Sequence, residues 1–384
     1  MPTTTTLGGS FRFLKYSTYL VLPLAIGLAL FSFNRESNRS TPLTASLLST
    51  STAPTMSKAV IVKEKGQLVI ESVPELTVSD SQVLIKSKAV SINPIDWKMS
   101  NFGFLIESWP TRLGYDVSGE ITKVGSKAAE RGFKAGDKVF ALTTGNAFGE
   151  YSTAEAIRTF KLPSNLSFED GATFPTALST AVYTLFADDG LKLARPNTHT
   201  RWFAPEYVVI WGGATSVGMY AVQLASAAGY NVIATASPKN HELVRSLGAS
   251  HVVDYKRDDV VEEIKKLTAG RARAGLDLVG HGDAIGKLSQ VLRANADIPA
   301  KIVSITSPDF NSPEGISFKF IMGLAPAVGE FVAKVLDEEV LEYFVQGRLK
   351  VNKVTKLEGL EGVLKGLDDS ANGRVSAEKL VAVL

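Results

Sequence analysis

Apolar residues are spaced in one way before residue 165 and in another way after residue 207. Between residues 56 and 165, short apolar or alternating runs are separated by polar stretches that contain glycine. Several short strands with turns between them are typical of a small barrel or sandwich. The strands that this pattern predicts are 58–62, 68–70, 82–90, 119–124 and 137–142.

A different order begins at residue 207. The apolar run 208–211 suits a strand that is buried on both faces of a parallel sheet. A glycine-rich turn, a helical segment that ends at Gly229 and a second apolar run at 231–236 follow it. The later elements of this alternation are helices near 238–247, 258–268 and 283–293 and a strand at 300–305. The alternation predicts an α/β domain with a doubly wound parallel sheet.

The pattern is mixed between these two regions and after them. Residues 167–186 predict a helix that Pro175 breaks or kinks, and 187–206 form a long polar connection that contains the stretch 197–202. The elements predicted in the tail are a helix at 326–346, a short segment at 351–354, a helix near 357–370 and a strand at 379–383.

Residues 1–55 differ in kind from the remainder, because they are rich in Ser and Thr and hold no acid before Glu36. The apolar run 19–33 is shorter than the ~20 residues that a membrane span needs. An organellar presequence, a signal-peptide segment, a membrane anchor and a start codon assigned too far upstream all stay open. In every case we expect the fold to begin near Met56. A cytoplasmic location is expected, with a mitochondrial or membrane-anchored one as the alternative.

Composition excludes several classes of function. The 384 residues hold 41 Lys and Arg against 39 Asp and Glu, so a net charge of +2 gives no electrostatic case for nucleic acid. The absence of cysteine excludes disulfides and thiolate metal sites. No two of the four histidines stand at a ligand spacing such as i, i+4, so we expect no metal site.

The turn at 212–218 carries the first candidate chemistry. Gly213 and Gly218 occupy the first and third positions of the G-x-G-x-x-G pattern, which places a dinucleotide pyrophosphate at a helix N-terminus. Thr215 holds the middle position, where Thr215 and Ser216 can offer hydroxyl donors instead. An ordinary glycine-bearing turn without a ligand stays open as the alternative.

The end of the second strand carries the next clue. An NAD site usually has Asp or Glu there to bind the ribose 2′-hydroxyl, but residues 235–240 contain no acid. Ser237 and Lys239 suit a 2′-phosphate, and Tyr255 can add a phenol donor. A helix N-cap followed by Pro238 explains the same residues without a ligand, and both can hold together. NADPH is therefore the predicted cofactor.

Several motifs together resemble one family, in order and spacing, from residue 56 to the end. They are SINPIDWK (91–98), LGYDVSG (113–119), GDKVF (136–140), FGEY (148–151), the turn at 207–218 and SPKN (237–240). The chain resembles the medium-chain dehydrogenase/reductase superfamily in its zinc-independent quinone-reductase and enoyl-reductase branch, above all the fungal trans-acting enoyl reductases.

The resemblance implies a GroES-like β-barrel catalytic domain (56–185 and 320–384), interrupted by a Rossmann NADP-binding domain (186–319) after the leader 1–55. Zinc-dependent relatives have Cys where Asn93 stands, so the resemblance implies no zinc here.

The resemblance also distributes roles. The cofactor-binding residues that it and the turn imply are Pro94, Ile95, Asp96 and Trp97 near the nicotinamide, Gly213, Ala214, Thr215, Ser216, Val217 and Gly218 at the pyrophosphate, Ser237, Pro238, Lys239, Asn240 and Tyr255 at the 2′-phosphate, Ser304 and Ile305 at the carboxamide, and Val375 and Ser376 as late contacts. Its substrate-binding residues are Thr176, Ser179, Thr180 and Tyr183, for which ordinary helix packing is the alternative.

The implied reaction is hydride transfer from NADPH to an activated C=C bond or a quinone, with an enone, enoyl thioester or quinone as substrate. A zinc-free carbonyl or alcohol reductase and a non-catalytic NADPH-binding scaffold or sensor are the alternatives. The proton donors that chemistry allows are Tyr115, Tyr151, Tyr183 and Lys98, and the sequence does not choose among them. A monomer and a dimer both stay open.

Overall fold

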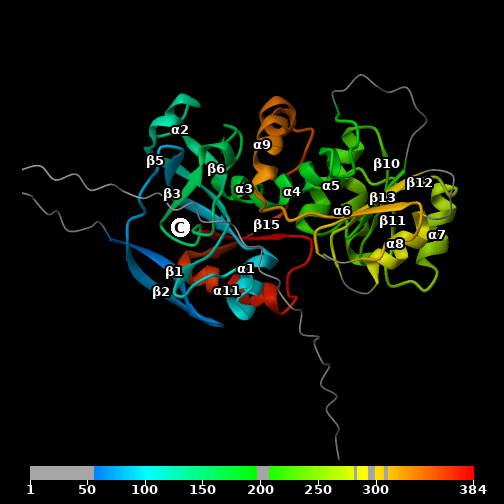
Figure 1. Cartoon of the computed structure of the whole chain (residues 1–384), viewed down its shortest axis with the longest axis horizontal. Helices are drawn as coiled ribbons and strands as arrows, with labels where there is room; N and C mark the ends of the chain where they lie inside the picture. Colours follow the sequence, from blue (N-terminus) through cyan, green and yellow to red (C-terminus); the bar gives the residue numbers. More distant parts are fainter. Residues whose placement is uncertain (1–55, 197–206, 281–282, 293–298, 307–309) are drawn as a thin grey trace, which may run out of the picture. The chain divides into compact units, whose positions relative to one another are not determined.

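The computed structural model describes residues 56–196, 207–280, 283–292, 299–306 and 310–384. The predicted leader, with its apolar run at 19–33, and the stretch 197–202 lie outside these residues. None of the helices in the described ranges is both long enough and apolar enough to cross a membrane. All described residues belong to one compact unit, Ala53–Leu384 (Figure 1).

Two sheets, one antiparallel and one mixed, are built mainly from the first part of the chain. One has three strands in the order β2-β1-β4, and the other has the order β15-β16-β3-β5-β6-β8, with β7 also paired to β3. The strands are β1 (Met56–Glu64), β2 (Gln67–Pro74), β3 (Gln82–Ser91), β4 (Thr111–Arg112), β5 (Asp116–Val124), β6 (Lys138–Leu142), β7 (Tyr151–Glu155), β8 (Thr159–Lys161), β15 (Val354–Glu358) and β16 (Lys379–Val383). Every strand predicted in this region is confirmed.

The end of the chain returns to the first region. The last strand, β16, pairs antiparallel with β3, so that Val381 lies opposite Ser91 and Ala382 opposite Val90. Alternate side chains of these strands enter a core that is shared with α11 (Gly359–Ala371). In Figure 1 the red C-terminal segment accordingly lies among the blue and cyan strands. The C-terminal strand thus extends the sheet that β3 and β5 belong to.

The middle of the chain forms a six-stranded parallel sheet in the order β11-β10-β9-β12-β13-β14. Its strands are β9 (Tyr207–Trp211), β10 (Asn231–Thr235), β11 (His251–Val253), β12 (Ala272–Asp277), β13 (Ala300–Ser304) and β14 (Ile316–Phe320). The order reverses on the two sides of β9, which confirms the doubly wound sheet that the alternating pattern predicts. The sequence did not predict β14, because its polar Ser317 and Lys319 suit an edge strand and interrupt the apolar run.

Helices connect and cover these sheets. Their bounds are α1 (Pro94–Phe102), α2 (Ser126–Glu130), α3 (Phe168–Ala172), α4 (Pro175–Phe186), α5 (Ser216–Ala227), α6 (His241–Ser246), α7 (Val260–Thr268), α8 (Ala284–Leu292), α9 (Pro326–Val335), α10 (Leu341–Val345) and α11, with short turns η1 (Ala156–Arg158), η2 (Pro238–Asn240) and η3 (Leu336–Val340). One hydrophobic core runs through α4, α5 and α9 and reaches both the barrel-side strand β6 and the parallel sheet. The domain boundaries at 185 and 320 therefore stay a proposal.

Two helical predictions are refined by the structure, and one helix was not predicted. The predicted helix 167–186 divides at Pro175 into α3 and α4, as the proline requires. The predicted helix 326–346 contains a π-helical turn, η3, between α9 and α10. The segment 94–102, for which the apolar pattern predicts no element, is the helix α1. Its signals were present in the sequence, since Pro94 takes the first helical position and the Asp96 carboxylate accepts the Asn93 N–H at 2.7 Å.

Candidate cofactor and substrate site

A cleft of about 550 Å³ opens where β9 and β10 end. The parallel sheet supplies one wall, and the segment that leads into β16 supplies the other. The residues that line it are Ile92, Pro94, Trp211, Gly212, Ala214, Thr215, Ser216, Thr235, Ala236, Ser237, Asn240, Tyr255, Val279, Ser370, Gly373, Val375, Ser376, Ala377, Glu378, Lys379 and Leu380. Ligands of doubly wound sheets bind at this carboxyl edge, where the strand order reverses.

The glycine turn is shaped by close packing. A Cβ atom on Gly218 would lie 2.1 Å from the Gly212 carbonyl oxygen, and one on Gly213 would lie 2.8 Å from the Ala234 Cβ. Neither position therefore accepts a side chain without displacing the start of α5. The glycines allow α5 to begin directly against the sheet, with its N-terminus facing the cleft.

The Thr215 hydroxyl forms its hydrogen bonds within the turn itself. It accepts the Gly218 N–H at 3.0 Å and donates to the Gly212 carbonyl at 2.9 Å, so it caps α5. The hydroxyl hydrogen that the sequence suggested for a phosphate is therefore already used. Within the described chain, the N–H groups of Ser216 and Val217 have no hydrogen-bond acceptor. These two amides, with the Ser216 hydroxyl beside them, suit an anion at the helix N-terminus.

The end of β10 gathers further polar groups. The Ser237 and Tyr255 hydroxyl oxygens lie 3.2 Å apart, which brings together two residues that the sequence placed 18 positions apart. Asn240 donates from Nδ2 to the Ser376 hydroxyl at 3.3 Å and links this end to the opposite wall of the cleft. The Lys239 side chain is exposed and, within the described chain, has no ion-pair partner. No carboxylate stands among the cleft-lining residues at this end.

Asp277 organises the loops that follow β12 and β13. Its buried carboxylate accepts the Val279 N–H at 3.1 Å and the Ser304 hydroxyl at 2.8 Å. Main-chain bonds at this point run from Ile305 N–H to the Asp277 carbonyl and from Ile321 N–H to the Ser304 carbonyl. Ser304 and Ile305 are therefore held rigidly near the cleft but do not line it, whereas Val279 does.

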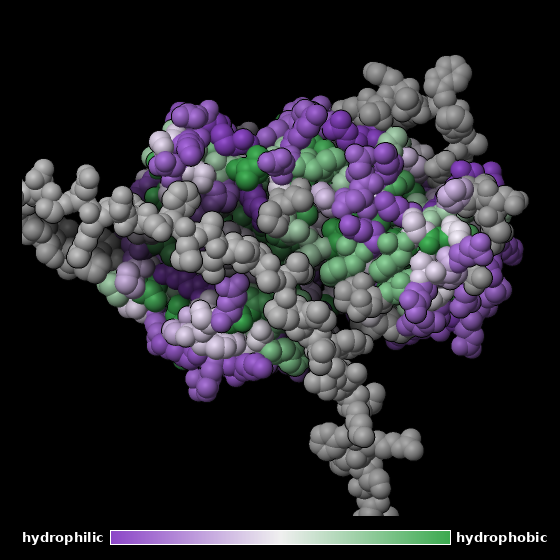
Figure 2. Space-filling view, in the orientation of Figure 1, coloured by the Kyte–Doolittle hydropathy of each residue, from purple (hydrophilic) through white to green (hydrophobic). Residues whose placement is uncertain are grey.

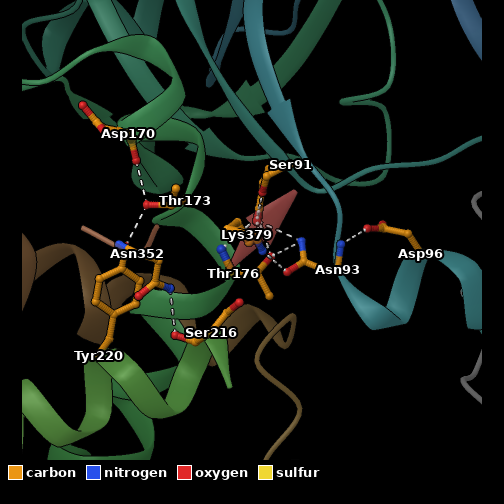
Figure 3. Close-up of polar contacts among 11 residues, drawn as sticks. Ser91, Asn93, Asp96, Asp170, Thr173, Thr176, Ser216, Tyr220, Asn352 and Lys379 are labelled. Atoms are coloured by element: carbon orange, nitrogen blue, oxygen red, sulfur yellow. Dashed lines mark hydrogen bonds and ion pairs between the residues drawn. The ribbon is translucent and has the colours of Figure 1, made fainter. Parts of the chain in front are cut away.

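A buried polar cluster lies beneath the opposite wall (Figure 3). Asp116, at the start of β5, is fully buried, and its Oδ2 lies 3.2 Å from the Nζ of Lys379. The Asn93 amide bridges the two, donating to Asp116 at 2.8 Å and accepting from Lys379 at 2.5 Å. Ser91 and Thr176 donate their hydroxyls to the same carboxylate. We call these five residues the Asp116–Lys379 cluster; Lys379 is the member that lines the cleft.

Asp96 lies close to this cluster but does not line the cleft. Burial raises the pKa of its carboxyl to about 8, the Asn93 N–H opposes this, and the negative charge of Asp116 adds to it. The carboxyl is therefore largely protonated at neutral pH. Its Oδ1 has no hydrogen-bond partner within the described chain. Burial, with a smaller effect of Asp96, likewise raises the pKa of Tyr115 to about 12, and the Tyr115 hydroxyl contacts the Met99 sulfur at 3.3 Å.

The helix predicted to face the substrate is α4, and its four candidate residues point in different directions. Thr176 belongs to the Asp116–Lys379 cluster. Ser179 packs beside Val328 and Gly329 of α9, and Thr180 packs against Gly323. Burial and a hydrogen bond with Asp189 raise the pKa of Tyr183, whose ring lies edge-on to Phe331 of α9. None of the four lines the cleft, and their substrate role stays a proposal.

The cleft brings together about half of the predicted cofactor residues. Those that line it are Pro94, Ala214, Thr215, Ser216, Ser237, Asn240, Tyr255, Val375 and Ser376. Those that stand behind or beside it are Ile95, Asp96, Trp97, Gly213, Val217, Gly218, Pro238, Lys239, Ser304 and Ile305. The lining residues that sequence reasoning missed include Trp211, Thr235 and Lys379. Thr235 carried a signal, since it ends the second strand of the βαβ unit, and its hydroxyl accepts the Gly212 N–H at 3.1 Å.

Within the described ranges, no group of three His, Asp or Glu side chains is arranged to hold a metal ion. The Asn93 side chain is committed to Asp116 and Lys379. On the face shown in Figure 2, hydrophilic residues gather mainly at the margins and hydrophobic residues are visible nearer the middle. Metal independence stays a proposal.

Comparison with known families gives two matches. The model of the alcohol dehydrogenase GroES-like domain matches residues 79–166, and that of the zinc-binding dehydrogenases matches residues 216–303. The first match covers strands β3 to β8, and the second covers the sheet from α5 to β13. They confirm the predicted fold class, a GroES-like domain with a Rossmann-like parallel sheet.

Three curated relatives are similar over different lengths. Dehydrogenase pigH of Monascus ruber is 38% identical over 235 residues, which cover 58% of this chain and 63% of that protein. Dehydrogenase azaJ of Aspergillus niger is 32% identical over 368 residues, or 86% of this chain and 99% of that protein. The trans-enoyl reductase fsa3 of a Fusarium species is 32% identical over 347 residues, or 82% of this chain and 94% of that protein.

Solved structures share the fold. A quinone oxidoreductase of Pseudomonas syringae has a TM-score of 0.72 at 20% identity and covers 86% of this chain and 100% of its own. Mycobacterial Rv1454c, solved in complex with NADPH, has a TM-score of 0.69 at 20% identity and covers 85% and 100%. At such identities the likeness concerns the fold alone.

Proposed function

The chain belongs to the medium-chain dehydrogenase/reductase family of oxidoreductases, and we propose that it is an NADPH-dependent reductase of activated C=C bonds or quinones. The observation that carries the proposal is the composition of the cleft. It joins a helix N-terminus, whose first amides have no acceptor within the described ranges, to an acid-free end of β10, and it reaches the Asp116–Lys379 cluster. Relatives along nearly the whole chain include trans-enoyl reductases, which favour this reaction within the family.

NADPH is preferred to NADH because of the groups at the end of β10. A carboxylate that binds the ribose 2′-hydroxyl would repel a 2′-phosphate, and among the described residues the only acid that lines the cleft is Glu378. Glu378 accepts a hydrogen bond from Thr355 at 2.7 Å and belongs to the far wall. The Ser237 and Tyr255 hydroxyls and the exposed Lys239 ammonium supply donors of the kind that phosphate binds.

NADPH, when bound, supplies a hydride. In the proposed reaction two electrons and one hydrogen reach the β-carbon of the acceptor, the C=C π electrons move onto the carbonyl oxygen, and a proton then joins the α-carbon. The protein's part is to hold the acceptor, to exclude water and to stabilise negative charge on that oxygen. We propose that this needs no zinc, and that Thr176, Ser179, Thr180 and Tyr183 take the substrate side.

Isotopic labelling tests the reaction directly. With NADPH deuterated at nicotinamide C4, an enone should yield a saturated ketone that carries deuterium on the β-carbon. Deuterium on the carbonyl carbon of an alcohol product would establish a carbonyl reductase instead. Tight NADPH binding with no turnover of enones, enoyl thioesters, quinones or aldehydes would favour a non-catalytic NADPH-binding protein.

Treatment with a chelator tests zinc independence. Activity that survives chelation would support zinc independence, and one bound zinc lost together with activity would refute it.

A further inference from the structure

Lys379 is a buried cation with an incomplete set of acceptors. Its side chain is only 2% exposed at the start of β16. An ammonium carries three N–H donors. One points to the Asn93 Oδ1 at 2.5 Å, and a second faces the Asp116 Oδ2 at 3.2 Å. Within the described chain, the third has no acceptor among the contacts of Lys379.

The other members of the Asp116–Lys379 cluster have no such donor to spare. The Asp116 carboxylate accepts from Ser91, Asn93 and Lys379 on Oδ2, and from both the N–H and the hydroxyl of Thr176 on Oδ1. The hydroxyl hydrogens of Ser91 and Thr176 are therefore committed to Asp116. The second amide hydrogen of Asn93 faces the Thr176 hydroxyl at 3.5 Å, the limit of a hydrogen bond. The ammonium is the strongest donor that the cluster can offer to a ligand.

The position of Lys379 places this donor beside the cleft. Lys379 lines the cleft, and among the cleft-lining residues of the described chain it is the sole Lys, Arg or His. Its charge is already removed from water and held in place by Asn93 and Asp116. A fixed and desolvated donor gains more from a new anionic partner than an exposed lysine does, because little reorganisation is left to oppose the contact.

We propose that Lys379 donates its third N–H to an anionic oxygen of the molecules bound in the cleft. The proposal rests on the proposed function and deepens it. Two oxygens have the required chemistry: a pyrophosphate oxygen of NADPH, and the carbonyl oxygen of the acceptor as it gains negative charge. The competing explanation is that Lys379 only neutralises Asp116.

Substitution of Lys379 by methionine separates these cases, because methionine keeps an unbranched apolar chain and removes the charge. The measurements are the NADPH dissociation constant by fluorescence titration, kcat at saturating NADPH, competition of inorganic pyrophosphate with NADPH, and thermal stability. Loss of a charge-assisted hydrogen bond should change the affected quantity by about ten- to one-hundred-fold. Lys379→Arg, which keeps a cation, should restore part of the loss.

The pattern of change identifies the oxygen. A rise in the NADPH dissociation constant, with weaker competition by pyrophosphate and a preserved kcat, assigns Lys379 to the pyrophosphate. A fall in kcat with NADPH affinity within about three-fold of wild type assigns it to the acceptor oxygen. If a folded Lys379→Met protein keeps both quantities within about three-fold, Lys379 is only the partner of Asp116 and the proposal is wrong.

A second variant keeps the proposal testable if the Lys379→Met protein does not fold. Lys379→Met combined with Asp116→Asn removes both buried charges together, which costs less than leaving one of them alone. It should show the same loss, and wild-type binding and turnover in it would overturn the proposal. A wild-type protein that does not bind NADPH refutes the proposed function itself. A wild-type protein that binds and turns over, beside an unaffected variant, refutes only the role of Lys379.

Discussion

The two walls of the cleft offer hydrogen-bond donors by opposite means. On the sheet side, the turn before α5 is neutral and its residues are small. The donors there are the main-chain amides of Ser216 and Val217, which have no acceptor among the described residues. On the other side, the donor is a buried charged side chain, Lys379, held by a fully occupied carboxylate. The first wall depends on residues next to one another in sequence, whereas the second joins β3, β5, β16, α1 and α4. We therefore expect mutations to act locally on the first wall and on the whole fold at the second.

The largest effect is expected for Asp116→Ala. The substitution leaves the Lys379 ammonium buried without its counter-ion and removes the acceptor of Thr176 and Ser91. It should lower the free energy of unfolding by about 3–5 kcal/mol, measured by urea denaturation. Asp259→Ala is the matched control, since Asp259 pairs with Arg257 in an exposed ion pair and should matter little. Equal effects of the two substitutions would contradict the contrast between the walls.

Asp96 lies beside the Asp116–Lys379 cluster, and the effect of Asp96→Asn on stability is expected to depend on pH. Because the pKa of Asp96 is raised to about 8 in the folded protein, the folded state holds a proton that the unfolded state releases near pH 4. The stability that this proton contributes is complete below about pH 4 and is lost progressively as the pH rises from about 4 to 8. A neutral amide in place of the carboxyl avoids that loss, so the variant should be more stable than wild type by about 2–4 kcal/mol at pH 7, and the gain should vanish near pH 4.

Thermal denaturation of both proteins between pH 4 and pH 9 measures this effect. Asp258→Asn makes the same change on an exposed side chain and serves as the control. A gain that does not depend on pH would mean that Asp96 is not protonated in the native protein.

The smallest effect is expected for Lys239→Glu on the sheet side. Loss of a charge-assisted contact to the 2′-phosphate should weaken NADPH binding by about 1.5–3 kcal/mol, while NADH binding and the unfolding free energy should hardly change. Calorimetric titration with both nucleotides measures the difference. Lys134→Glu carries the same charge change on an exposed barrel lysine and should leave both affinities intact. Equal wild-type affinities for NADH and NADPH would remove the basis of the cofactor assignment.

The sequence predicted more of the sheet-side wall than of the other wall, because the sheet-side wall is built from consecutive residues. The turn at 212–218 was recognisable because its glycines, its capping Thr215 and the helix that follows are consecutive residues with a local geometric cause. The role of the Thr215 hydroxyl was misjudged, since only the structure shows that its hydrogen is given to Gly212. Helix α1 was missed although Asn93, Pro94 and Asp96 carry a local start signal.

The sequence by itself determined most of the longer strands and helices, the doubly wound sheet, the position of the glycine turn and the absence of cysteine ligands. These follow from local spacing and composition, which need no knowledge of distant contacts. Tertiary structure alone decided that Lys379 meets Asp116 and Asn93, and that Ser179 and Tyr183 face α9 rather than the cleft. Lys379 is 286 residues from Asn93, and a lysine at the first position of a strand gives no local sign of burial. Its partners are fixed only when β16 adds to β3 and closes the layer over Asp116.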